Sequence, residues 1–235
     1  MKRVFLFMAT LWLGIMGASA QTDNCDVNGD GVVNIADVTY VLDHILGKGH
    51  AATFTVEAID LGLPSGTKWA SCNVGASSPE EYGGYYAWGE TEEKEVYDES
   101  TYKYYQNDEY VNLGIDISGT EYDVAHVKWG GNWCMPTLDD INELYANCRS
   151  EWTTFKGVNG EKFTSNINGN SIFLPAAGIR INGDIKFAGD YGIYWSSTQH
   201  PDYSNYAHRL GFGSGGVELY GVRRFGQTVR PVIRN

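Results

Sequence analysis

Residues 26–37 place oxygen-bearing side chains at a spacing that suits a calcium ion. The run reads DVNGDGVVNIAD, and its first, third, fifth, ninth and twelfth positions are Asp or Asn. Gly31 occupies the sixth position, where a loop wrapped around one ion must turn sharply. Because Ca²⁺ takes about six to eight hard oxygen ligands, the pattern predicts a structural Ca²⁺ site. The predicted ligands are Asp26, Asn28, Asp30, the carbonyl of Val32, Asn34 and Asp37.

One helix is expected after this loop. Apolar residues recur at helical spacing over 38–46, and Gly47 ends the run. A calcium loop of this kind, EF-hand-like but with Asp at its last position, resembles one repeat of a type I dockerin. Dockerins pack two such repeats together, whereas the resemblance covers only residues 21–47. We therefore expect either a calcium-stapled N-terminal cap or a module that docks on a cohesin-like partner.

Residues 1–20 have the form of a secretory signal peptide. The basic start Lys2-Arg3 precedes an apolar run over 4–15, and Ala18-Ser19-Ala20 fits a signal-peptidase site. The residues before Cys25 do not fit a lipidation site. We expect a secreted, cell-surface or periplasmic protein without a membrane span.

The charge of the chain excludes some partners. It carries 17 Lys and Arg against 29 Asp and Glu, a net charge of −12, which argues against nucleic acid and anionic lipid. Residues 80–123 hold 13 of the acids, whereas residues 208–235 hold five Arg and one acid. This basic end predicts either an acidic ligand or pairing with the acidic segment of the same chain.

A larger domain is expected over residues 53–235, after a short linker at 48–52. Alternation over 53–58 predicts a strand, and a turn at 63–66 precedes another extended segment. Thr137 and Asp140 predict a capping box at the start of a helix. Its inward face would carry Leu138, Ile141, Leu144, Tyr145 and Cys148. Short strands broken by Gly and Asn would follow.

Six sequence blocks of this domain, in order, resemble the Fibrobacter succinogenes major paralogous domain family. The blocks are 60–76 (DLGLPSGTKWASCNVGA), 85–90 (YYAWGE), 129–137 (WGGNWCMPT), 173–178 (FLPAAG), 194–197 (YWSS) and 229–232 (VRPV). The sequence departs from the family at Cys134, where Arg is frequent. The resemblance implies an α+β, C-type lectin-like domain with short strands and one or two helices. It also implies that residues 53–58 pair with residues 228–233.

The resemblance further points to the stretch between Trp195 and Arg230 as a ligand surface, because related variable proteins display changeable side chains there. About half of its residues should alternate inward as core. The candidate ligand-binding residues are Tyr203, Asn205, Tyr206, His208, Arg209, Glu218, Tyr220, Arg223 and Arg224.

Several chemistries are disfavoured. The sulfatase-modifying branch of this fold needs a reactive Cys pair near the C-terminus, but the last Cys here is Cys148. Calcium-dependent lectins of this fold use a contiguous Gln-Pro-Asp motif. Residues 199–202 read Gln-His-Pro-Asp, so His200 interrupts that motif. We expect a non-catalytic binding or adhesion protein that recognises a protein or a glycan. The alternatives are an accessory, dockerin-tethered component of a polysaccharide-degrading assembly and, third, a glycoside hydrolase.

Export would allow the four cysteines to form disulfides. The preferred pair is Cys72 with Cys148, and Cys25 with Cys134 is a possible second pair. Sequence alone does not choose among the three connectivities that four cysteines allow.

Overall fold

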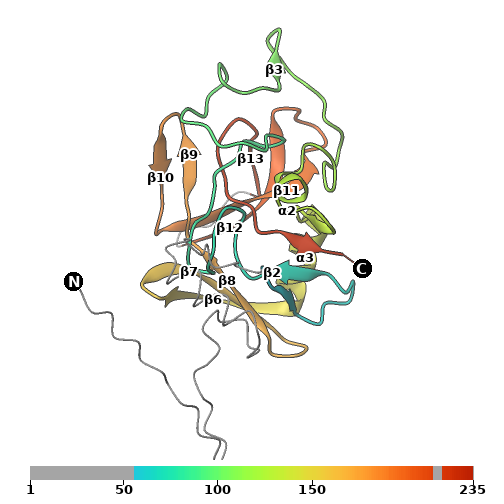
Figure 1. The fold of residues 1–235 in the computed structure, drawn as a ribbon, viewed down its shortest axis with the longest axis vertical. Coiled ribbons are helices and arrows are strands. Elements are labelled where there is room, and N and C mark those ends of the chain that lie inside the picture. Colours follow the sequence, from blue (N-terminus) through green and yellow to red (C-terminus); the bar gives the residue numbers. More distant parts are fainter. Residues whose placement is uncertain (1–55, 214–218, 235) are drawn as a thin grey trace, which may run out of the picture. The chain divides into compact units, whose positions relative to one another are not determined.

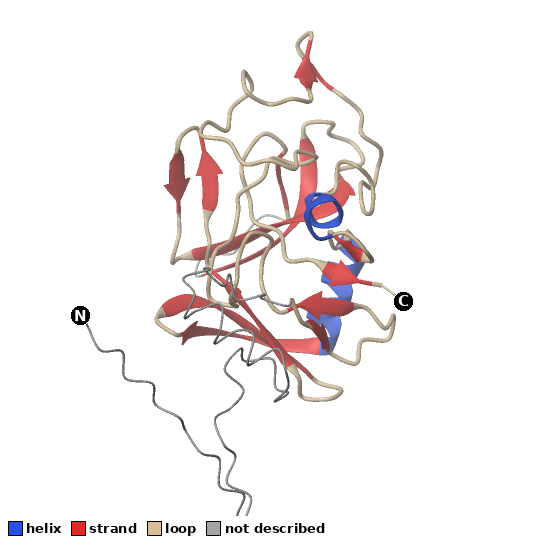
Figure 2. Cartoon of the chain, in the orientation of Figure 1, coloured by secondary structure: helices blue, strands red, loops and turns tan. Residues whose placement is uncertain are grey.

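The computed structural model of the chain describes residues 56–213 and 219–234. This part is mostly β, with several small antiparallel sheets and two short helices (Figure 1, Figure 2). The expected mixture of short strands and few helices is confirmed in this coarse form. The predicted signal peptide, calcium loop, following helix and linker lie outside the described residues, as does Glu218.

A four-stranded sheet combines the two ends of the described part. Its order is β1 (Ala58–Asp60), β2 (Lys68–Ala70), β14 (Val232–Ile233) and β5 (Trp133–Cys134). The expected pairing of residues 53–58 with residues 228–233 is wrong for the described end of the first strand, because β2 lies between β1 and β14, and residues 53–55 lie outside the described part. Trp69 of β2 is fully buried and pairs with Val232, whereas β1 ends at the exposed Asp60. The more apolar strand therefore takes the interior position of the sheet.

A second sheet contains β6 (Cys148–Phe155), β7 (Val158–Ser165) and β8 (Ser171–Pro175). The turn between β6 and β7 is Lys156-Gly157, and both residues have positive φ, 46° and 85°. Two such residues form the tight turn that matches the twist of a hairpin. The apolar β8 packs its buried side chains into the core.

A third sheet contains β11 (Tyr191–Gln199), β12 (Tyr206–Gly213) and β13 (Tyr220–Val222). The β11–β12 register shifts between Trp195 and Gln199, as at a bulge. Two hairpins complete the described strands, β9 (Ile179–Ile181) with β10 (Asp184–Lys186), and β3 (Tyr105–Gln106) with β4 (Glu109–Tyr110).

Helix α3 (Leu138–Asn147) starts where the sequence predicts. Thr137 is its N-cap, and the side chains and backbones of Thr137 and Asp140 form the predicted capping box. Ile141 and Leu144 are buried as expected, whereas Tyr145 is 38% exposed. The resemblance allows a second helix, but the position of α2 (Val124–Trp129) was not predicted. Its N-cap is the buried Asp123, whose carboxylate accepts hydrogen bonds from the amides of Ala125 and His126.

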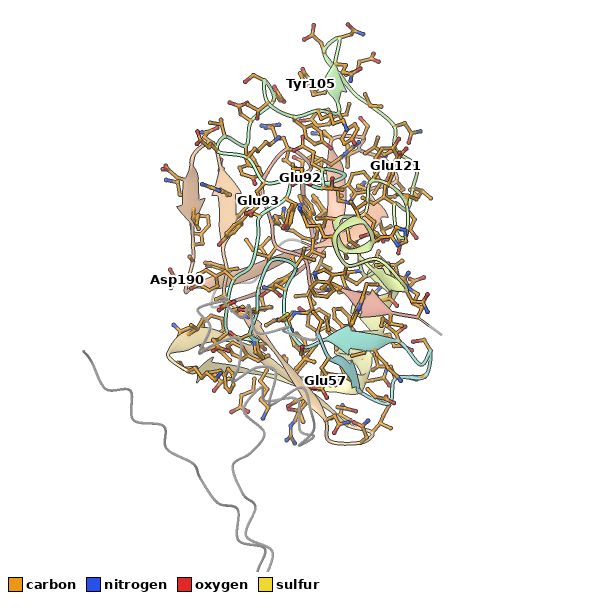
Figure 3. The ribbon with its side chains drawn as sticks, viewed as in Figure 1. Glu57, Glu92, Glu93, Tyr105, Glu121 and Asp190 are labelled. Carbon is orange, nitrogen blue, oxygen red and sulfur yellow. The ribbon has the colours of Figure 1, made fainter. Side chains whose placement is uncertain are left out.

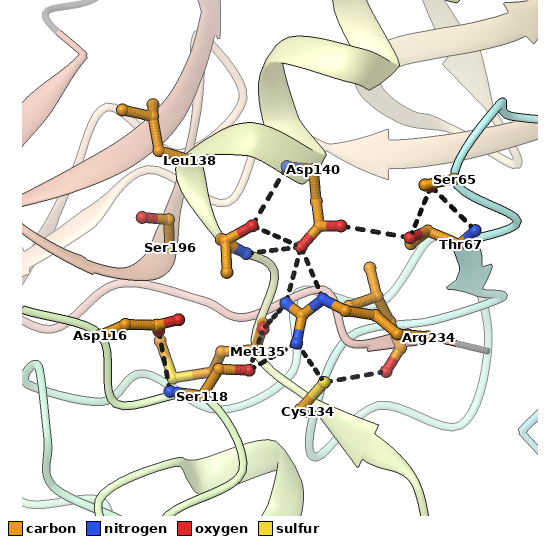
Figure 4. A network of polar contacts seen from close by, with 12 residues as sticks. Ser65, Thr67, Asp116, Ser118, Cys134, Met135, Leu138, Asp140, Ser196 and Arg234 are labelled. Carbon is orange, nitrogen blue, oxygen red and sulfur yellow. Dashed lines mark hydrogen bonds and ion pairs between the residues drawn. The ribbon is translucent and has the colours of Figure 1, made fainter.

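An ion pair fastens the last described residue, Arg234, to α3 (Figure 4). Nη2 of Arg234 lies 2.6 Å from Oδ2 of Asp140, the capping-box residue. A second guanidinium nitrogen donates to the Ser118 hydroxyl at 2.8 Å. Burial alone would raise the pKa of Asp140, but hydrogen bonds from Arg234 and Thr137 outweigh it and hold the pKa below its usual value.

The described cysteines are free thiols. The expected Cys72–Cys148 disulfide is therefore wrong, and Cys134 is also unpaired in the described part of the chain. The Cys72 thiol donates to the carbonyl of Ala76, whereas Cys148 packs in a core cluster with Phe163. Burial raises the pKa of Cys72 to about 11, so this thiol is unreactive near neutral pH.

Candidate ligand-binding face

The hairpin of β12 and β13 sets the spacing of the candidate ligand-binding residues. His208 pairs with Tyr220 and Tyr206 pairs with Val222, so side chains at 206, 208 and 220 emerge on one side of the hairpin. The intervening Ala207 is buried in a core cluster with Trp88 and Trp195. The inward and outward alternation expected of this stretch is therefore present.

Five rings gather on the outward side of this hairpin and on the loop before it. We call them the aromatic face, and its members are His200, Tyr203, Tyr206, His208 and Tyr220. His200 is the hub, with ring centroids 4.9 Å from Tyr203, 5.1 Å from Tyr220 and 5.4 Å from His208. Tyr206 meets Tyr203 at 6.1 Å and Tyr220 at 5.5 Å, both nearly edge-on. The contacts make one continuous cluster.

The face is accessible to a large ligand. The exposed fraction is 57% for Tyr203 and 36% for Tyr220, while Tyr206 and His208 are half-buried. Such partly exposed rings keep an apolar surface available while their contacts hold them in place. Phenol hydroxyls and imidazole nitrogens add hydrogen-bonding groups at the same surface.

The two histidines of the face are stacked, with an angle of 14° between their rings. Nδ1 of His200 accepts a hydrogen bond from the amide of Asp202 at 3.2 Å. Nδ1 of His208 is buried and has no hydrogen-bond partner in the described residues. Burial, and then the neighbouring His200, lower the pKa of His208. His208 is therefore held neutral near pH 7.

Arg223 does not reach the face, although it was predicted to bind ligand. It is fully buried, and its guanidinium lies 4.6 Å from the centre of the Trp88 ring. It donates to the Tyr102 hydroxyl and to the carbonyls of Val111 and Ser204. Arg223 thus joins the loop at 102–111 to the loop that carries Tyr203, which makes it a positioning residue.

The other predicted ligand-binding residues that the structure describes also lie outside the aromatic face. Arg224 forms an ion pair with Glu99 at 2.9 Å, so the basic end does contact the acidic segment of the same chain. Arg209 is half-buried on the inward side, where a Cβ on Gly221 would come within 2.7 Å of its Nη1. Asn205 is half-buried, and its carbonyl accepts a hydrogen bond from the amide of Arg223. The structure thus brings together Tyr203, Tyr206, His208 and Tyr220.

His200 is the member of the face that sequence reasoning missed. It was noticed only as the residue that interrupts a lectin motif at 199–202. Its position next to Pro201 and close to an aromatic-rich hairpin was the available signal. The contacts across the loop depend on the tertiary fold.

The acidic segment forms a hollow of about 280 Å³ with several Glu residues around it, of which Figure 3 labels Glu92, Glu93 and Glu121. Its carboxylates already have partners. Glu92 pairs with Lys128 at 3.1 Å, and Glu93 accepts a hydrogen bond from the amide of Tyr85. Within the described ranges, no group of three or more His, Cys, Asp or Glu is arranged to hold a metal ion. The aromatic face is the better candidate site.

Part of the chain matches the model of a protein family. Residues 137–232 match DUF8237, a domain of unknown function. The matched span runs from the N-cap of α3 to the start of β14 and includes the whole aromatic face. No curated protein and no solved structure matches the chain. Among the described helices, none is long and apolar enough to cross a membrane.

Proposed function

We propose that this protein is an exported, non-catalytic binding protein whose aromatic face recognises a glycan. The single observation that carries the proposal is the cluster of five rings on β12, β13 and the preceding loop. Tyrosine rings stack on the apolar faces of sugars, while phenol and imidazole groups hydrogen-bond hydroxyls. A protein ligand is the other class that such a surface fits, and the experiment below separates the two.

The fold that best suits this function is C-type lectin-like, as the resemblance to the major paralogous domain family implies. Residues of the resembling blocks form much of the core, among them Trp69, Trp88 and Trp195, each at most 1% exposed. The sheet that joins β2 near the start of the domain to β14 at its end supports this fold. The core would then be a rigid platform for the hairpin that carries the face.

The buried acids support binding over hydrolysis. Only Asp123 and Asp140 are buried acids in the described ranges. Asp123 accepts four backbone hydrogen bonds, including those from Gly119 and Met135 at 2.8 Å, and Asp140 pairs with Arg234. Both carboxylates are thus committed to holding the fold, whereas a glycosidase needs two carboxyl groups facing one substrate.

The calcium loop at 26–37 completes the proposal. Its ligand spacing favours a structural Ca²⁺ ion in a dockerin-like N-terminal module, and the signal peptide favours export. Both features rest on the sequence, because these residues lie outside the described ranges.

The test is a glycan array probed with the full chain, in calcium and then in EDTA. We expect binding that survives EDTA and falls at least tenfold in Tyr203→Ala and Tyr220→Ala. Tyr105→Ala is the matched control, because Tyr105 lies on the β3–β4 hairpin and its ring packs on Tyr110, which is not a member of the aromatic face. A silent array, or binding that the face variants leave intact, would contradict the glycan proposal. A silent array would favour a protein ligand.

A further inference from the structure

A cavity separate from the aromatic face lies between the β6–β7–β8 sheet and the segment that contains β1. Its volume is about 430 Å³, within the range of small-molecule sites. Phe155 of β6, Lys162 of β7 and Phe173 of β8 line one wall, and Glu57 and Ile59 belong to another segment that lines it. We call this space the β1–β8 cavity. Glu57 lies at the level of the β6–β8 sheet in Figure 3.

The walls of the cavity are largely apolar, with hydroxyls at their margins. The rings of Phe155 and Phe173 pack against each other with centroids 5.4 Å apart. Ile59 and Ile172 extend this surface, and Ser171 and Thr153 add polar groups. Phe155 is 39% exposed, so part of the aromatic wall is open to a ligand. An apolar side chain would lose water-exposed surface by entering here.

The lining carries two opposite charges that have no ion-pair partner among the described residues. Neither Glu57 nor Lys162 forms an ion pair within residues 56–213 and 219–234. Glu151 lies opposite Lys162 in the β6–β7 register, yet these two residues do not pair. The neighbouring Lys156, by contrast, is engaged with Glu80 at 3.0 Å. The cavity therefore offers one carboxylate and one ammonium group to a ligand that carries the complementary charges.

The size of the cavity restricts that ligand. A volume of 430 Å³ corresponds to a sphere about 9 Å across, close to the roughly 7–11 Å that two or three extended residues span. A single extended residue spans only about 3.6 Å and would leave most of this length empty. We propose that the β1–β8 cavity binds a di- or tripeptide with free termini and an apolar side chain. The peptide ammonium meets Glu57, its carboxylate meets Lys162, and its side chain packs on Phe155 and Phe173.

The test is calorimetric titration of the full chain with Ala-Phe-Ala, and with the same peptide acetylated and amidated. The free peptide should bind, and the capped peptide should bind about tenfold more weakly or not at all. Glu57→Gln and Lys162→Gln should each weaken binding of the free peptide about tenfold. Both residues are exposed, so these variants should keep the thermal unfolding midpoint of the parent chain.

Glu109→Gln and Lys186→Gln are matched controls, because both residues are exposed and neither lines the cavity. They should leave peptide binding unchanged. Absence of binding at millimolar peptide would overturn the proposal. Equal affinity for the free and capped peptides, or equal losses in the control variants, would also overturn it. The result is independent of the glycan array, since no residue of the aromatic face lines this cavity.

Discussion

At the scale of single residues, the basic side chains near the C-terminus stabilise the fold. Arg230 is fully buried, and it donates to Asn73 and to the carbonyls of Ala70, Ser71 and Phe173. Arg223 is also fully buried, and it donates to the carbonyl of Ser204 in the loop that carries Tyr203. A buried guanidinium can satisfy several carbonyls at once, because it carries five donors in one plane. These arginines therefore act through the groups they hold in place.

Arg223→Met should destabilise the protein by about 3 kcal/mol or more. The change leaves the Tyr102 hydroxyl and the carbonyls of Val111 and Ser204 without their donor, and each lost partner costs roughly 1–3 kcal/mol. Arg224→Met is the adjacent control and should cost less than about 1 kcal/mol, because Arg224 pairs with Glu99 near the surface. Urea unfolding measures both, and equal losses in the two variants would contradict the positioning role of Arg223.

His208 should make stability depend on pH. Its pKa is lowered in the folded state from the usual 6.5, so the unfolded chain takes up a proton more readily. This contribution to stability is fully present above pH 6.5 and is lost as pH falls through the lower folded pKa. His208→Gln should flatten the dependence of the unfolding free energy between about pH 8 and about pH 5. His126→Gln on α2 is the control, and an unchanged pH profile in His208→Gln would refute this assignment.

At the scale of the elements, α3 links three parts of the fold through its first turn. Thr137 and Asp140 cap the helix, Asp140 also pairs with Arg234, and the Thr67 hydroxyl donates to Asp140 at 3.2 Å. The carboxylate thus joins the helix to the β1–β2 turn and to the end of β14 (Figure 4). Because Asp140 makes several contacts, replacing it should destabilise the protein more than replacing an ordinary capping residue does.

Thr137→Ala should cost about 1 kcal/mol, the usual loss for a helix N-cap. Asp140→Asn should cost more, because it also removes the charge that Arg234 faces. The pKa of Asp140 is lowered in the folded state, so its contribution is present above pH 3.8 and is lost as pH falls through the folded pKa. Unfolding followed between about pH 6 and about pH 2 should show a weaker acid dependence in Asp140→Asn. An equal dependence in both chains would refute the coupling.

The capping signal explains why the start of α3 could be predicted to the residue, whereas Cys148, expected on the helix, is its C-cap and the first residue of β6. The Thr137–Asp140 pair is a local signal, because the two residues lie within one turn of the helix that they cap. Helix α2 was missed because it has only one turn of apolar pattern and starts at a single Asp123. The position of β1 was also missed, since strand order depends on which of two short segments is more buried, and β2 carries the buried Trp69. Local signals therefore predicted where an element starts better than they predicted which strands lie side by side in a sheet.

At the scale of the whole molecule, four members of the aromatic face were among the residues to which the family resemblance pointed. The expected alternation did not say which of these side chains face outward, and His200 enters the cluster through a loop contact that no periodicity encodes. Arg223 was placed among the ligand-binding residues because charge near an aromatic stretch looks the same whether it is buried or exposed. Its burial depends on Trp88 and Tyr102, which lie more than a hundred residues away. Long-range packing thus explains why His200 was missed and why Arg223 was wrongly placed among the ligand-binding residues.

The chain should bind one Ca²⁺ ion through residues 26–37. Exposed loops of this class bind with dissociation constants of roughly 10⁻⁴–10⁻³ M, so calorimetric titration should use millimolar calcium. Asp30→Ala should abolish binding, since it removes a charged ligand at the fifth position of the loop. Asp98→Ala is a control outside the loop. Calcium uptake that persists in Asp30→Ala would move the site elsewhere. Glycan binding that is lost in both EDTA and Asp30→Ala would show that the N-terminal module supports the aromatic face.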